Sequence, residues 1–153
     1  MPKAIVVREH GGPEVLRLDD VEVGPPAEGE LQMRHTAIGV NFIDVYDRTG
    51  LYPTTLPTGL GREAAGVVTA IGRRVRGFRV GERVAYAHPK PGAYAELRNV
   101  PADRVVRLPR GIDDADAAAL MLKGLTAWYL LRRTYRVQRG YMEIGRASCR
   151  ERV

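Results

Sequence analysis

The chain has 153 residues, of which 44% are apolar and 27% charged, and its formal net charge at pH 7 is +6. This length and composition suit a globular protein with a buried core and argue against a disordered chain. No run approaches roughly eighteen apolar residues, and the N-terminus, MPKAIVVREHGG, lacks a signal-peptide pattern. We therefore expect a cytoplasmic protein with no membrane contact.

The first forty residues predict three strands. Two short apolar runs flank a His-Gly-Gly-Pro turn and indicate a hairpin, and a longer run follows a cluster of Gly and Pro. The predicted strands are residues 2–8, 15–18 and 30–40, with Leu31, Met33 and His35 on one face of the last.

Residues 39–66, GVNFIDVYDRTGLYPTTLPTGLGREAAG, carry most of the polar groups suited to binding. Asn41 begins a predicted short amphipathic helix, which bears Asp44 and Tyr46 and breaks at Gly50. A glycine-punctuated loop between two ordered elements is a common way to present polar groups to a small ligand. We therefore place the candidate site here.

The remaining pattern is a series of short strands followed by helices. Glycine turns separate the strands, which favours a β-barrel or sandwich. An acidic start and strong helix formers then predict one helix from about residue 113, an interruption at Gly124, and a second helical segment at 125–133. The predicted strands are 64–71, 83–87, 93–100 and 104–108.

Several kinds of chemistry have no support in the sequence. His10, His35 and His88 have no metal-ligand spacing, and we interpret them as structural or surface residues. One cysteine excludes a disulfide within the chain, and no Gly-x-Ser-x-Gly or Ser-His-Asp signature supports hydrolysis. Any catalysis by this chain would therefore have to come from a bound cofactor.

An ordered set of short motifs resembles one family. Asn41-Phe42-Ile43-Asp44, Gly50-Leu51-Tyr52-Pro53, Gly59-Leu60-Gly61 and Glu63-Ala64-Ala65-Gly66, with Leu122-Lys123-Gly124-Leu125-Thr126 further on, resemble the NADPH:quinone oxidoreductase (zeta-crystallin-like) branch of the medium-chain dehydrogenase/reductase superfamily. The resemblance runs from Met1 to about Met142. It implies a chaperonin-10-like (GroES-like) β-barrel at 1–110 and a helical connection at 111–142 that leads into a Rossmann domain.

The resemblance also implies a reaction. NADPH would donate hydride to a quinone or an enone, and the full-length protein would be a homodimer. Zinc-dependent relatives place Cys where this chain has Asn41 and His where it has Arg62. A guanidinium cannot donate a lone pair to zinc, so we expect no catalytic zinc.

Eight residues receive site roles from the same resemblance. Asn41, Tyr46 and Tyr52 are the expected catalytic residues, with a tyrosine hydroxyl hydrogen bonded to the substrate oxygen. The expected cofactor-binding residues are Phe42, Asp44, Lys123, Thr126 and Tyr129. Alternatives remain: Phe42 and Tyr129 as core aromatics, Asn41 as a helix cap, Tyr52 as a loop clamp, and Glu63 as an acceptor from neighbouring backbone.

The end of the sequence departs from the family. A glycine-rich phosphate loop is expected directly after residue 142, but residues 143–153 read EIGRASCRERV and resemble the translation of a common short-read sequencing adapter. We interpret them as an artefact tail on the N-terminal part of an enzyme, and we expect this chain to be inactive.

Two other functions stay open. One is a freestanding GroES-like binding or assembly module. The other is RNA binding, which some zeta-crystallin-like proteins show. The basic runs Arg73-Arg74-Val75-Arg76 and Arg132-Arg133 permit RNA binding, but we favour their interpretation as a solvated turn and a solvated helix face, and no aromatic-interleaved RNA motif accompanies them.

Overall fold

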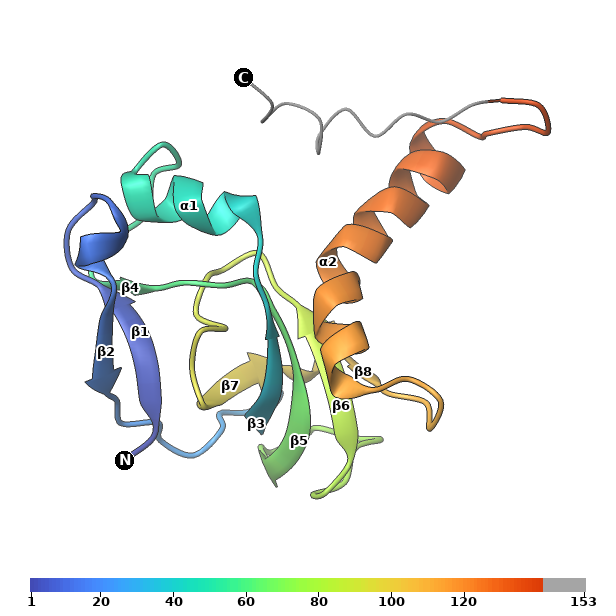
Figure 1. Ribbon diagram of the computed structural model, residues 1–153. Helices are drawn as coiled ribbons and strands as arrows, with labels where there is room; N and C mark the ends of the chain where they lie inside the picture. Colours follow the sequence, from blue (N-terminus) through green and yellow to red (C-terminus); the bar gives the residue numbers. More distant parts are fainter. Residues whose placement is uncertain (142–153) are drawn as a thin grey trace. The chain divides into compact units, whose positions relative to one another are not determined.

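The computed structural model describes residues 1–141, which divide into two compact units, one formed by Met1–Lys123 and one that begins at Gly124. The first unit is built mainly from β-strands (Figure 1). Part of the long helix α2 (Asp114–Tyr129) belongs to it. The expected mainly-β class with helices is therefore confirmed.

The strands form two antiparallel sheets. The smaller sheet has the order β2-β1-β4 and the larger the order β7-β3-β5-β6-β8. Strand β3 pairs with β5 over most of its length, from Leu31 opposite Ile71 to Gly39 opposite Glu63. The bounds are β1 Lys3–Val7, β2 Arg17–Asp20, β3 Glu30–Gly39, β4 Thr58–Gly59, β5 Glu63–Ile71, β6 Arg83–Ala87, β7 Leu97–Pro101 and β8 Val105–Arg107.

The two sheets meet along residues 94–96. Ile5 N donates to Tyr94 O at 2.8 Å, and His35 N donates to Glu96 O at 2.9 Å. This segment therefore joins β1 to β3 by local contacts, with one bridge between Ala4 and Ala95. Within residues 1–141 the ladders form two sheets and not one closed barrel.

Both faces of the larger sheet carry buried side chains. One face carries the main core, in which alternate residues of the strands point inward. The other face presents Ala65 and Ala85 to Ala117 and Ala118 of α2. Small side chains on both sides allow the helix to pack closely on the strands. The main core consists of Leu31, Met33, Ala64, Val68, Val84, Tyr86, Ala93, Val100 and Val105.

Most predicted elements are present, with four corrections. The strand predicted at 15–18 begins later, because Pro13–Val15 form a 3₁₀ turn and β2 starts at Arg17. The predicted strand at 93–100 begins only at Leu97, because residues 94–96 bond to β1 and β3 instead. Strand β4 was not expected. Gly124 does not interrupt the helix, since α2 continues through it to a π-helical turn at Leu130–Thr134. No helix among residues 1–141 is long and apolar enough to cross a membrane.

His35 is a structural histidine, as expected. Its Nδ1 lies 2.6 Å from Ala95 O, so the neutral ring carries its proton there and leaves Nε2 to face the Tyr86 hydroxyl at 3.3 Å. Burial lowers the pKa of His35 to about 4, and the cation of Arg98 adds to this effect.

We expect this histidine to make the fold sensitive to acid. The unfolded chain binds a proton at His35 near pH 6.5 and the folded chain only near pH 4, so the stabilisation is complete above pH 6.5 and is lost as the pH falls towards 4. The loss is roughly 3 kcal/mol. Urea unfolding across this range measures it. The His35→Gln variant should show a flatter profile, whose residual slope combines His88, whose pKa burial lowers, with Asp44, whose pKa burial raises. An unchanged profile would contradict the assignment.

Candidate functional site

The candidate site begins where β3 gives way to helix α1 (Phe42–Thr49). Asn41 is the N-cap, with extended backbone (φ −132°, ψ 151°), and it forms a capping box with Asp44. The Asp44 carboxylate accepts the Asn41 N–H at 2.9 Å. Gly50 ends the helix with φ +78°, a left-handed conformation that glycine adopts easily. The interpretation of Asn41 as a helix cap is therefore confirmed.

Glu63 lies beneath this helix start and is fully buried. Its Oε1 accepts a hydrogen bond from Asn41 Nδ2 at 2.7 Å, and its Oε2 accepts one from the backbone N–H of Leu122 at 2.5 Å. The Lys123 ammonium lies 3.5 Å from Oε1. One carboxylate on β5 therefore ties the start of α1 to the part of α2 in the first unit.

Lys123 is the exposed member of this cluster. Its side chain is 55% exposed, and its ammonium also donates to Val40 O at 3.2 Å. The positive charge therefore lies at the surface beside Asn41 while it balances the buried charge of Glu63. Such a cation suits an anionic group or an oxygen that gains negative charge.

Aromatic rings follow the helix. The rings of Phe42 and Tyr46 meet edge to face with centroids 5.1 Å apart, and those of Tyr46 and Tyr52 lie 5.3 Å apart. Phe42 is 50% exposed and Tyr52 is 46% exposed. Phe42 is therefore not a core aromatic. The row offers flat apolar surface and two hydroxyl groups to a ligand.

Asp44 faces the interior instead. Its side chain is 4% exposed, and Tyr94 donates its hydroxyl to Asp44 Oδ2 at 2.9 Å. Burial raises the pKa of Asp44, and burial together with this hydrogen bond raises that of Tyr94. The cofactor contact expected of Asp44 stays a prediction. Its carboxylate is buried beneath the protein surface.

Asp47 and Arg62 form a second polar pair that the sequence analysis did not identify. The Arg62 guanidinium contacts both carboxylate oxygens of Asp47, at 2.8 and 2.7 Å, and also donates to Pro89 O. Asp47 is fully buried. Asp47 follows Asp44 by three residues, so both carboxylates lie on one helix face. This spacing was the signal in the sequence that could have pointed to Asp47. A cavity of about 500 Å³ adjoins the pair and is also lined by Tyr52 and Lys90.

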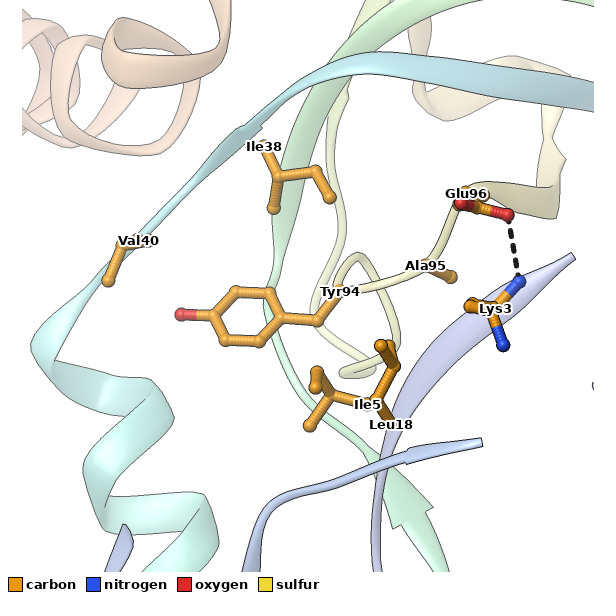
Figure 2. Close-up of a pocket in the computed structure, with 8 residues that line it drawn as sticks. All are labelled: Lys3, Ile5, Leu18, Ile38, Val40, Tyr94, Ala95 and Glu96. Atoms are coloured by element: carbon orange, nitrogen blue, oxygen red, sulfur yellow. Dashed lines mark hydrogen bonds between the residues drawn. The ribbon is translucent and has the colours of Figure 1, made fainter. Parts of the chain in front are cut away.

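A separate apolar groove of about 320 Å³ lies between β1, β2 and the end of β3 (Figure 2). Ile5, Leu18, Ile38 and Val40 line it, with the ring of Tyr94 between them. At one end the backbone N–H of Lys3 donates to the Glu96 carboxylate at 2.9 Å. The hydroxyl of Tyr94 links this groove to α1 through Asp44.

The structure thus gathers Asn41, Phe42, Tyr46, Tyr52 and Lys123 in the first unit. Thr126 and Tyr129 belong to the second unit, so their cofactor roles stay predictions. The artefact assigned to residues 143–153 lies outside the described residues. Among residues 1–141, no group of three or more His, Cys, Asp or Glu side chains is arranged to hold a metal ion.

Comparison with known proteins agrees with this architecture. Residues 27–110 match the alcohol dehydrogenase GroES-like domain. A quinone oxidoreductase of Pseudomonas aeruginosa is 52% identical over 92% of the chain and 43% of its own length. A 2-haloacrylate reductase of a Burkholderia species is 43% identical over 92% of the chain and 44% of its own length.

A solved structure is equally similar. The crystal structure of Escherichia coli quinone oxidoreductase complexed with NADPH superposes with a TM-score of 0.87, at 48% identity, over 89% of this chain and 42% of that one. The chain spans less than half the length of each of these relatives. It belongs to the alcohol dehydrogenase GroES-like domain family, within which relatives about 50% identical to it are quinone oxidoreductases.

Proposed function

We propose that the chain is the N-terminal catalytic part of an NADPH-dependent quinone oxidoreductase that works without zinc. The observation that carries the proposal is the Asn41, Glu63 and Lys123 cluster at the start of α1, in a chain about 50% identical to quinone oxidoreductases. Its exposed ammonium and the adjoining aromatic row are suited to a flat acceptor that gains negative charge.

Several residues fit the nicotinamide end of the cofactor. Exposed Phe42 offers a flat apolar face and Lys123 a cation. The cofactor roles of Thr126 and Tyr129 stay predictions. Asp44 would act indirectly, because its buried carboxylate accepts hydrogen bonds from the Asn41 N–H and the Tyr94 hydroxyl. The bound cofactor supplies the hydride. The 153 residues contain no glycine-rich loop for a dinucleotide pyrophosphate, so we propose that other residues of the full-length protein hold that part.

The tyrosines provide the hydrogen bond that the acceptor needs. Reduction of a quinone places negative charge on its oxygen, which a hydroxyl donor stabilises. Tyr46 and Tyr52 lie ring against ring, and Tyr52 also lines the 500 Å³ cavity. We therefore assign the acceptor to this side of α1, with Asn41 at its inner edge.

Arg62 supports a mechanism without catalytic zinc. Asp47 holds its guanidinium through two oxygens, and a guanidinium has no lone pair for a metal. The amide of Asn41 donates a single hydrogen bond to the carboxylate of Glu63. Both side chains that stand at the zinc-ligand positions of related enzymes therefore have another task.

We propose a quinone or an activated alkene as the acceptor. The relatives include quinone oxidoreductases and a 2-haloacrylate reductase, and both kinds of named substrate are electron-poor conjugated systems. A homodimer of the full-length protein stays a prediction.

Activity measurements test the proposal. We expect the purified chain to show no NADPH oxidation with a benzoquinone. The assay monitors the absorbance of the reduced nicotinamide, which should stay constant. A chimera of residues 1–123 with the remainder of Escherichia coli quinone oxidoreductase 1 should turn over. Asn41→Ala in the chimera should lower kcat/KM about 10²-fold. Gly24→Ala is the matched control, because a methyl group there meets no atom within 4 Å. A folded chimera that binds NADPH without turnover would refute the proposal.

A further inference from the structure

Glu63 is fully buried and contacts two of the assigned site residues, Asn41 and Lys123, at once. A carboxylate only accepts hydrogen bonds, and this one has three donors around it. They are Asn41 Nδ2 at 2.7 Å, Leu122 N at 2.5 Å and Lys123 Nζ at 3.5 Å. A buried charge with several fixed donors defines the geometry of each donor.

The carboxylate determines which way the Asn41 amide points. Asparagine has a donor end and an acceptor end, and only the donor end, Nδ2, makes a bond with a carboxylate. Its carbonyl end is then turned away from Glu63, at the start of α1, where Asn41 and Asp44 form the capping box. The free N–H groups of a helix start attract an acceptor and repel an NH₂ group, so this orientation suits both neighbours.

We propose that Glu63 is a positioning residue of the site, which holds the Asn41 amide in one orientation and keeps the Lys123 ammonium beside it. The inference deepens the proposed function and rests on it for the roles of Asn41 and Lys123. Through the cap, Glu63 also fixes where α1 starts, and therefore where Phe42 and Tyr46 stand.

The substitution Glu63→Gln gives a specific expectation. The N–H of Leu122 is part of a helix and cannot turn, so the introduced glutamine keeps its one oxygen there and presents its NH₂ group to Asn41. The NH₂ group of the glutamine and that of Asn41 would then face each other, unless the Asn41 amide rotates by half a turn. The variant should therefore reverse this amide and place NH₂ against the N–H groups of α1.

Nuclear magnetic resonance detects this reversal in the chain as it stands. The sequence has two asparagines, Asn41 and Asn99. Asn99 donates to Gly24 O and Pro25 O and is an internal control. With ¹⁵N-asparagine, Glu63→Gln should shift the side-chain amide pair of Asn41, speed its exchange with water and leave the pair of Asn99 in place. An unchanged Asn41 pair would overturn the proposal.

A rescue experiment covers the case in which Glu63→Gln folds poorly. Asn41→Asp puts two carboxylates in contact and should lower the Tm. Adding Glu63→Gln restores a matched pair, because the glutamine NH₂ now donates to the aspartate. The second substitution should therefore lower the Tm of the natural chain but raise that of Asn41→Asp. Equal decreases in both backgrounds would show a general structural role and refute the assignment. Both readouts are independent of turnover, so failure of the oxidoreductase proposal would leave them unchanged.

Discussion

Arg62→Met is expected to destabilise the first unit by about 3–5 kcal/mol. The substitution leaves the carboxylate of Asp47 fully buried without the cation that contacts both its oxygens. Methionine fills much of the space of the arginine stem, so the loss comes from the uncompensated charge and not from a cavity. Urea unfolding, followed by circular dichroism, measures it.

Two controls separate this effect from a general loss of charge. Arg74→Met removes an ion pair with Glu28 whose arginine side chain is 80% exposed, and it should cost about 0–1 kcal/mol. Asp47→Leu combined with Arg62→Met removes both charges and should recover much of the stability that the single variant loses. If Arg62→Met costs no more than Arg74→Met, the buried pair does not stabilise the fold.

The fold was largely predictable because most strands carry their own signal in the sequence. Leu31 and Met33 alternate with polar neighbours, and both are buried on one face of β3. The acidic start of α2 acts as expected, with Asp113 Oδ1 accepting the N–H of Asp116 at 2.7 Å. The predicted break at Gly124 was wrong because a glycine costs only about 1 kcal/mol inside a helix, which neighbouring helix formers offset.

The site was predictable only in part, since its residues come from distant places in the sequence. The motif resemblance suggested site roles for Asn41 and Lys123, but no local pattern joins either to Glu63, whose backbone partner is 59 residues away. The pairing of Asp47 with Arg62 likewise joins residues that no local sequence pattern connects. The groove beside Tyr94 depends on the meeting of two sheets, which hydrophobic alternation does not specify.

Gly39→Ala is expected to destabilise the first unit by about 3 kcal/mol, which is at the upper end of the usual range for substitutions that overpack a core. A methyl group at this buried position would lie 2.2 Å from Ala118 O and 2.4 Å from Glu63 Cγ. The first contact is with the backbone of α2, which cannot move aside as a flexible side chain does. The helix must shift away from β3, and its hydrogen bond from Leu122 to Glu63 must lengthen.

Hydrogen exchange gives this prediction a local readout. In Gly39→Ala the amide of Leu122 should exchange faster relative to the amides of β5, because the shift separates it from Glu63. Gly24→Ala is the matched control, since a methyl group there has no neighbour within 4 Å, and it should change stability by less than about 0.5 kcal/mol. Equal stability of the two variants would mean that α2 does not pack on β3 as closely as described. Because Glu63 joins this contact to Asn41, close packing at Gly39 is also a condition for the geometry of the site.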